Sequence, residues 1–127
     1  MKLPPYAEAL GLVIEAEGEG PPLLMLPYAD KVMGRPGFLH GGALGGLLEV
    51  AAIAALRHAL GAEEAAQIKP INVTIDFMRG GREKETRAAG VVTRLGMRVA
   101  NVEAQAWQDD RARPIAAARM NYLIVRR

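Results

Sequence analysis

The sequence contains no cysteine and no serine among its 127 residues. Without cysteine there is no disulfide framework, no thiolate zinc site, no iron–sulfur cluster and no cysteine nucleophile. Without serine, a Ser-His-Asp triad with its nucleophile elbow is excluded. Any catalysis must therefore rely on carboxylates, imidazoles, guanidinium groups or backbone amides.

The sequence also has few histidines and a small net charge. With only His40 and His58 present, we do not expect a metal site. Sixteen Lys and Arg against 14 Asp and Glu give a net charge of +2, which is too small to indicate a nucleic-acid or membrane partner. The charge is uneven, with 3 basic and 6 acidic side chains in residues 1–50 but 13 and 8 in residues 51–127. We therefore expect an anionic ligand to favour the second half.

The composition is that of one domain spanning residues 1–127, since half of the residues are apolar and 24% are charged. Pro4 and Pro5 interrupt the N-terminal stretch where a signal peptide needs an unbroken apolar run. We therefore expect a cytoplasmic protein.

The longest apolar run covers residues 41–60 and has the pattern of a helix that is apolar nearly all round until Arg57. Such a helix must be covered on every side. Glu49 in mid-run and the early Arg57 argue against a membrane span, and Gly61 is a plausible end of the helix. The run therefore predicts a helix buried inside a domain.

Downstream of this helix the hydrophobic period becomes two, as in strands that place one face on a core. The predicted strands cover residues 71–77, 85–95, 102–106 and 118–124, with two shorter candidates at 12–17 and 23–26. Short connections favour antiparallel pairing. The pattern predicts an α+β fold in which an antiparallel sheet wraps around the long central helix, with a partner sheet or second subunit closing the remainder. Exposed edges then favour an oligomer, most simply a symmetric dimer.

The start of the predicted helix is the candidate functional site. Its glycine-rich entry, His40-Gly41-Gly42, would let a ligand approach the unpaired amides of a helix N-terminus, where developing negative charge is stabilised. This describes an oxyanion hole. The alternatives are that the glycines serve a tight turn or close helix packing, and that His40 is a helix-entry residue bonded to backbone.

Glu49 is the second candidate, because a carboxylate within an apolar helix is costly to bury. Such a group is paired, protonated, or retained as a base or nucleophile. The alternative to a catalytic role is a structural ion pair with an arginine.

These residues together resemble a known family. The sequence His40-Gly41-Gly42, the acidic Glu49 nine positions after the histidine, Asp76-Phe77-Met78-Arg79 and Arg94-Leu95-Gly96-Met97-Arg98 are similar to the hotdog-fold acyl-CoA thioesterases of the phenylacetate-degradation type. The resemblance extends from about Tyr6 to Ile124. It implies the hotdog fold, a coenzyme A thioester as substrate, no cofactor, and active sites at the interface of a homodimer or homotetramer.

The resemblance also implies residue roles. Glu49 would act as nucleophile or as base for water, and Gly41 would donate its amide to the thioester carbonyl, with His40 and Gly42 beside it. Gly34 stands at a substrate-contacting position where the family usually has Asn or Gln. Loss of one oxyanion donor costs about 2.7–4 kcal/mol of transition-state stabilisation, so a replacement donor or slow turnover is expected. Ile53 stands where some members place a hydroxyl.

Basic residues near strand ends are candidates for binding the nucleotide of coenzyme A: Arg79, Arg82, Lys84, Arg94 and Arg98. For any one of them, the alternative is a solvated, ion-paired sheet edge.

Hydrolysis of an acyl-CoA or aryl-CoA thioester is the function that the sequence favours. A dehydratase of the same fold is disfavoured, because Arg35 occupies the position of the histidine that precedes the helix glutamate by fourteen residues in the enzymes of that type. A non-catalytic acyl-CoA binding or sensing protein remains open, since Gly34 removes a polar side chain from the site.

Overall fold

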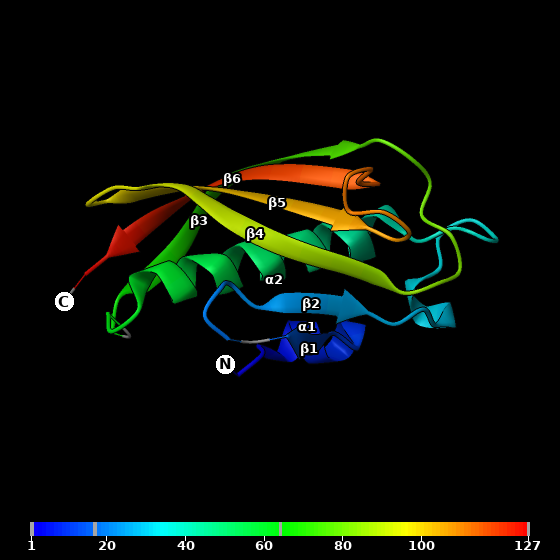
Figure 1. Ribbon diagram of the computed structural model, residues 1–127, viewed down its shortest axis with the longest axis horizontal. Coiled ribbons are helices and arrows are strands. Elements are labelled where there is room, and N and C mark those ends of the chain that lie inside the picture. The colour runs from blue at the N-terminus through cyan, green and yellow to red at the C-terminus, as the bar shows by residue number, and fades with distance from the viewer. Residues whose placement is uncertain (1, 17, 64, 127) are drawn as a thin grey trace.

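The computed structural model describes residues 2–16, 18–63 and 65–126. One long helix lies along a six-stranded sheet, and a short helix flanks it near the N-terminus (Figure 1). In chain order the elements are α1 (Pro5–Leu10), β1 (Val13–Ala16), β2 (Leu23–Leu26), the 3-10 turn η1 (Asp30–Val32), α2 (Gly41–Leu60), β3 (Gln67–Phe77), β4 (Thr86–Leu95), β5 (Val99–Trp107) and β6 (Ala116–Val125). This confirms the predicted α+β hotdog fold.

All strand pairs are antiparallel, and the strands follow the order β1-β2-β4-β5-β6-β3. The sheet therefore ends in β1 at one edge and β3 at the other. The buried face of β4, β5 and β6 packs on α2 (Figure 1). The core consists of apolar residues from that face and from the helix, with Leu47, Leu48, Leu56, Val102 and Tyr122 among its largest members.

Most strand boundaries agree with the sequence, since the prediction for residues 23–26 is confirmed and those for β4, β5 and β6 differ by a few residues at their ends. The predicted strand over residues 12–17 appears as β1, and its last residue, Glu17, lies outside the described residues. Strand β3 begins four residues before its predicted start, and it includes Pro70. A proline lacks the N–H that a central strand needs, but an edge strand tolerates it, and here the register shifts between Pro70 and Asn72.

Helix α1 is an element that the sequence prediction lacks. Pro5 stands at its first turn, and Gly11 ends it with φ +81° in the left-handed region. Six residues are too few to display a helical period, so pattern reading passes over the segment. The helix packs closely on α2 at Gly46, where there is no room for a side chain unless its neighbours shift. A Cβ atom added to Gly46 would lie 2.7 Å from Tyr6 Oη and 2.9 Å from Leu10 Cδ1.

The predicted helix over residues 41–60 is confirmed as α2. One chain does not cover it on every side, so the expectation that a partner sheet or second subunit closes the remainder stays a prediction. Gly41, Gly42 and Glu49 are exposed, and Ile53 and Arg57 are half-buried. We call this row of residues the open stripe of α2. The length and mean hydropathy of 1.5 would suit a membrane span, yet 67% of that window is buried inside the protein, as in a core helix.

The open stripe remains uncovered because most of strand β3 does not pack on α2. The sequence predicts that Ile71, Val73, Ile75 and Phe77 rest on the core, whereas Ile71, Val73 and Phe77 are about half exposed. Only the end of β3 reaches α2. A Cβ atom added to Gly45 would lie 3.1 Å from Ile75 Cδ1, and one added to Gly41 would lie 3.5 Å from Phe77 Cζ. One chain therefore leaves both an apolar strand face and a helix stripe uncovered.

Sheet and helix approach each other closely at Gly90 of β4. A Cβ there would lie 2.7 Å from the Ala51 carbonyl oxygen, 2.9 Å from Ala55 Cβ and 3.1 Å from Ala52 Cα. These neighbours are mostly helix backbone, which cannot rotate away. Glycine at this position sets the distance between the two layers.

We predict that Gly90→Ala lowers the free energy of unfolding by about 1–3 kcal/mol, and Gly90→Val by more, because added volume pushes β4 away from α2. Urea unfolding followed by circular dichroism measures this change. Gly20→Ala is the matched control, since its Cβ meets nothing within 4 Å, and its effect should stay within about 0.5 kcal/mol. Equal stability of the two variants would contradict the prediction.

Candidate active site

His40 caps the start of α2. Its Nδ1 accepts a hydrogen bond from the Gly42 N–H at 2.8 Å, and its own backbone N–H donates to the Val32 carbonyl at 2.8 Å. In this arrangement Nδ1 acts as the acceptor, and the ring can make other contacts through Nε2. A Cβ at Gly42 would lie only 3.0 Å from Nδ1, so glycine leaves room for the ring. The interpretation of His40 as a helix-entry residue bonded to backbone is confirmed.

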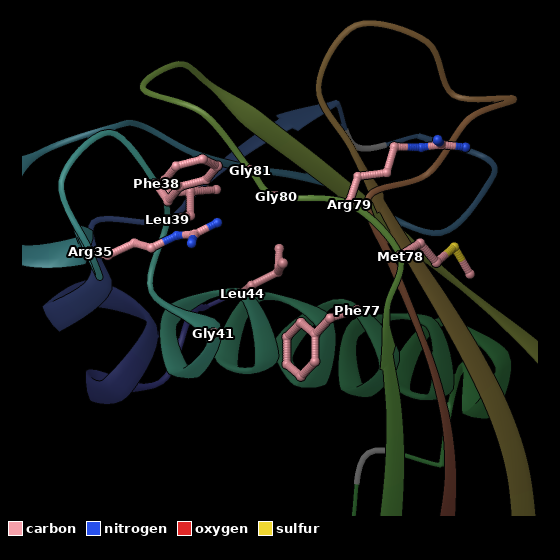
Figure 2. A pocket seen from close by; sticks show the side chains of 10 residues that line it. All are labelled: Arg35, Phe38, Leu39, Gly41, Leu44, Phe77, Met78, Arg79, Gly80 and Gly81. Carbon is pink, nitrogen blue, oxygen red and sulfur yellow. The ribbon is translucent and has the colours of Figure 1, made fainter.

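Gly41 supplies the amide that remains available. Its N–H has no hydrogen-bond partner within residues 2–16, 18–63 and 65–126, whereas the Gly42 N–H is engaged by His40. Gly41 also borders a cavity of about 350 Å³, lined by Arg35, Phe38, Leu39, Gly41, Leu44, Phe77, Met78, Arg79, Gly80 and Gly81 (Figure 2). An unpaired N–H at the positive end of a 20-residue helix suits a carbonyl oxygen that gains negative charge.

Two loops, residues 34–40 and 78–82, form the upper wall of this cavity (Figure 2). The Leu39 N–H donates to the Gly81 carbonyl at 2.9 Å. The side chains of Phe38 and Leu39 fill the space beside Gly80 and Gly81. A Cβ atom added to Gly80 would lie 2.6 Å from Phe38 Cε1, and one added to Gly81 would lie 2.7 Å from Leu39 Cδ1. The two glycines are therefore needed for the loops to meet.

Gly34 is held by the backbone around it. A Cβ there would lie 3.0 Å from His40 Cα and 3.3 Å from His40 N, and the Gly34 N–H donates to the Phe38 carbonyl at 2.9 Å. The amide side chain that the family usually carries here would press on the residue that caps α2. A side chain at this position would therefore require a small shift of the His40 backbone.

Two arginine side chains stack on the ring of Phe38. Arg35 Cζ lies 4.0 Å and Arg82 Cζ 4.4 Å from the centre of its ring, within the range of cation–π attraction. Two guanidinium groups so close to one ring must occupy opposite faces. Sequence reasoning selected Arg82 but did not assign Arg35 to the site, because no local pattern links residues 35, 38 and 82.

The loop that carries Arg82 is anchored by Gln108. The Gln108 Oε1 accepts from the Arg82 N–H at 3.0 Å, and its Nε2 donates to the Arg82 carbonyl at 3.0 Å. The same amide donates to the buried Thr86 hydroxyl at 3.1 Å. This arrangement holds one wall of the cavity to the end of β5.

The other basic candidates divide into two groups. Arg79 lines the cavity at Gly41, whereas Lys84 forms an exposed ion pair with Asp109 at 2.6 Å. Arg94 and Arg98 line a separate cavity of about 410 Å³ at the hairpin between β4 and β5. That hairpin lies at the opposite end of the molecule from the start of α2 (Figure 1). Their role in binding coenzyme A stays a prediction.

Glu49 lies on the open stripe, eight residues beyond Gly41. At 1.5 Å per residue the two are separated by about 12 Å along the helix. The carboxylate is exposed and has no ion pair or hydrogen bond among the residues that the structure describes, so the ion-pair alternative is not seen there. The expected cost of burying Glu49 does not arise in one chain, because the sheet does not reach this side of α2.

Two tyrosines border the position of Glu49. Tyr6 Oη reaches α2 at Gly46, three residues before Glu49. From the core side, burial and then the Glu49 charge raise the pKa of Tyr122, whose hydroxyl donates to Met120 Sδ at 3.1 Å. Both tyrosines escape sequence reasoning because they come from the two ends of the chain. In the described parts of the chain, no group of three His, Cys, Asp or Glu side chains could hold a metal ion.

Comparisons with known proteins give a consistent result. The family model of the thioesterase superfamily matches residues 36–115, which is 80 of the 127 residues. The conserved protein PA5202 of Pseudomonas aeruginosa has a similar structure, with a TM-score of 0.86, 28% identity, and coverage of 97% of this chain and 95% of that protein. No curated protein matches the chain in sequence.

Two further structures share the fold at lower identity. The phenylacetic acid degradation-related protein of Ralstonia eutropha JMP134 gives a TM-score of 0.82 at 24% identity, covering 97% of this chain and 92% of its own. Thioesterase HI1161 of Haemophilus influenzae gives 0.82 at 20%, covering 95% and 82%. The family match covers the loop at Phe38, helix α2 with Glu49, and strands β3, β4 and β5. The chain therefore belongs to the thioesterase superfamily, and its class of reaction is thioester hydrolysis.

Proposed function

We propose that this protein hydrolyses acyl-CoA or aryl-CoA thioesters to a free acid and coenzyme A. The observation that carries the proposal is the open stripe of α2, which presents an unpaired Gly41 N–H at a cavity and an exposed Glu49 carboxylate on one helix. The first suits a carbonyl oxygen and the second suits attack on its carbon or activation of water.

We further propose that each active site is shared between two copies of the chain. A donor must lie within about 3 Å of the oxygen that it stabilises, and the roughly 12 Å between Gly41 and Glu49 is too far for both to serve one carbonyl. Two helices packed antiparallel about a two-fold axis would bring Gly41 of one copy to Glu49 of the other.

Strand β3 supports such a dimer, since it is a sheet edge whose Ile71, Val73 and Phe77 are half exposed. A long apolar edge strand favours pairing with another chain. A second exposed apolar surface, made of Val91, Leu95, Met97, Val99 and Leu123, supports the association of two dimers into a homotetramer.

In this reaction, the thioester oxygen accepts the Gly41 N–H, and the carbonyl carbon is attacked by Glu49 or by water that Glu49 deprotonates. The bond from carbon to sulfur breaks, and the coenzyme A thiolate takes up a proton. If Glu49 attacks, water then hydrolyses the resulting anhydride. One water is consumed on either route, and the products are a carboxylic acid and coenzyme A.

The nucleotide phosphates need cationic partners, and Arg79 at the cavity wall and Arg82 on the neighbouring Phe38 ring are candidates on this side of the molecule. In an antiparallel dimer, Arg94 and Arg98 of the second copy approach the same site, because the hairpin that carries them lies at the opposite end of the molecule. Both groups therefore belong to the proposed coenzyme A site.

We predict that Glu49→Gln lowers turnover at least about 100-fold while acyl-CoA binding persists, because the amide can neither attack nor accept a proton. Release of free thiol from phenylacetyl-, benzoyl-, hydroxybenzoyl- and straight-chain acyl-CoA measures turnover, and the cysteine-free protein adds no background. Glu103→Gln, at another exposed carboxylate, is the control with unchanged activity. Binding without hydrolysis by the wild type would instead favour an acyl-CoA sensor.

A mixing experiment tests the shared site. Gly41→Pro removes the N–H and keeps the helix, because proline is favoured at the first helical position and His40 already has ψ 133°. We predict that Gly41→Pro and Glu49→Gln are each inactive, and that subunit exchange between them restores about a quarter of wild-type activity, from the one intact site of each heterodimer. No recovery after exchange, verified by native mass spectrometry, would place the site within one chain.

A further inference from the structure

The side chain of Arg35 enters the cavity next to Gly41. It leaves the loop before α2 and extends between Leu39 and the start of the helix, with its guanidinium directed into the cavity (Figure 2). We propose that Arg35 is a catalytic residue that donates a second hydrogen bond to the thioester carbonyl oxygen, beside the Gly41 N–H. This inference rests on the proposed thioester hydrolysis.

The site needs such a donor because the other candidates are unavailable. Gly34 has no side chain to offer, and the Gly42 N–H is already engaged by His40. Among the residues that line the cavity, only Arg35 and Arg79 have polar side chains. Figure 2 shows Arg79 directed away from the start of α2, which leaves Arg35 as the side chain that faces Gly41.

Arg35 is an exposed residue, and stacking on Phe38 is the contact that restricts its guanidinium. The guanidinium stacks 4.0 Å from the centre of the Phe38 ring, and that ring is itself fixed against Gly80, where its Cε1 lies 2.6 Å from a Cβ position. Arg82 on the opposite face, at 4.4 Å, prevents the ring from shifting that way. A donor restricted in this way needs less reorganisation when charge develops on the oxygen.

The electrostatics also suit this role. Arg35 has no ion pair within the described ranges of the chain, and no carboxylate lines the cavity. A guanidinium stays protonated at all working pH values and forms shorter, stronger hydrogen bonds to anionic oxygen than a neutral amide does. It therefore favours the tetrahedral intermediate, in which the oxygen is negative, over the neutral thioester.

The test compares Arg35→Met with the wild type on two substrates that share an acyl group, an acyl-CoA and the corresponding N-acetylcysteamine thioester, which has no phosphates. If Arg35 contacts the carbonyl oxygen, kcat falls about 10²–10³-fold on both substrates, with little change in KM. Arg35→Lys should recover part of kcat, and Phe38→Leu should lose less than Arg35→Met. Arg111→Met is the control, because Arg111 also stacks on an aromatic ring, Trp107 at 4.5 Å, outside this cavity.

Other outcomes separate this proposal from its premise. A raised KM for the CoA ester alone, with unchanged kcat on both substrates, would show that Arg35 binds phosphate and would overturn the inference. Equal kinetics of Arg35→Met and the wild type would also overturn it while leaving thioester hydrolysis intact. If the wild type hydrolyses neither substrate, the proposed function fails, and the inference fails with it. Unchanged thermal melting of Arg35→Met excludes unfolding as the cause of a loss.

Discussion

The structure depends on how one sheet buries an apolar helix of 20 residues. Close contact at Gly90 draws β4 onto α2, and β5 and β6 extend the cover, but six strands in a single layer do not close around a cylinder. The uncovered part is the open stripe with Glu49, together with the exposed face of β3. The same geometric shortfall therefore favours self-association and keeps a carboxylate accessible.

The start of α2 shows how a local hydrogen-bond requirement becomes chemistry. The first turn of any helix has N–H groups without helical partners. His40 satisfies the second of them, and the first, at Gly41, is left facing a cavity. A cap that satisfied both amides would give a more stable helix end but would leave no free N–H at the cavity. The incomplete cap and the glycines that border the cavity are thus parts of one arrangement.

Much of the fold could be predicted from the sequence because it rests on periodicity. The all-apolar run gave α2 its bounds, and alternation located the strands. Periodicity does not reveal which partner a face receives, so it does not show that one chain leaves Glu49 and the apolar side of β3 exposed. Nor does it reveal the stacking of Arg35 and Arg82 on Phe38, since residues 38 and 82 are brought together only by the loops at each end of the cavity. Gly34 was recognisable as a departure from the family, but its tight fit against His40 required coordinates.

That fit restricts substitution at position 34. A Cβ atom at position 34 would lie 3.0 Å from His40 Cα, so a side chain there would require the residue that caps α2 to shift by a few tenths of an ångström. Close-packed backbone does not yield to one substitution without a cost elsewhere. A change at position 34 is therefore easier when it is accompanied by an adjustment of the loop that ends at His40.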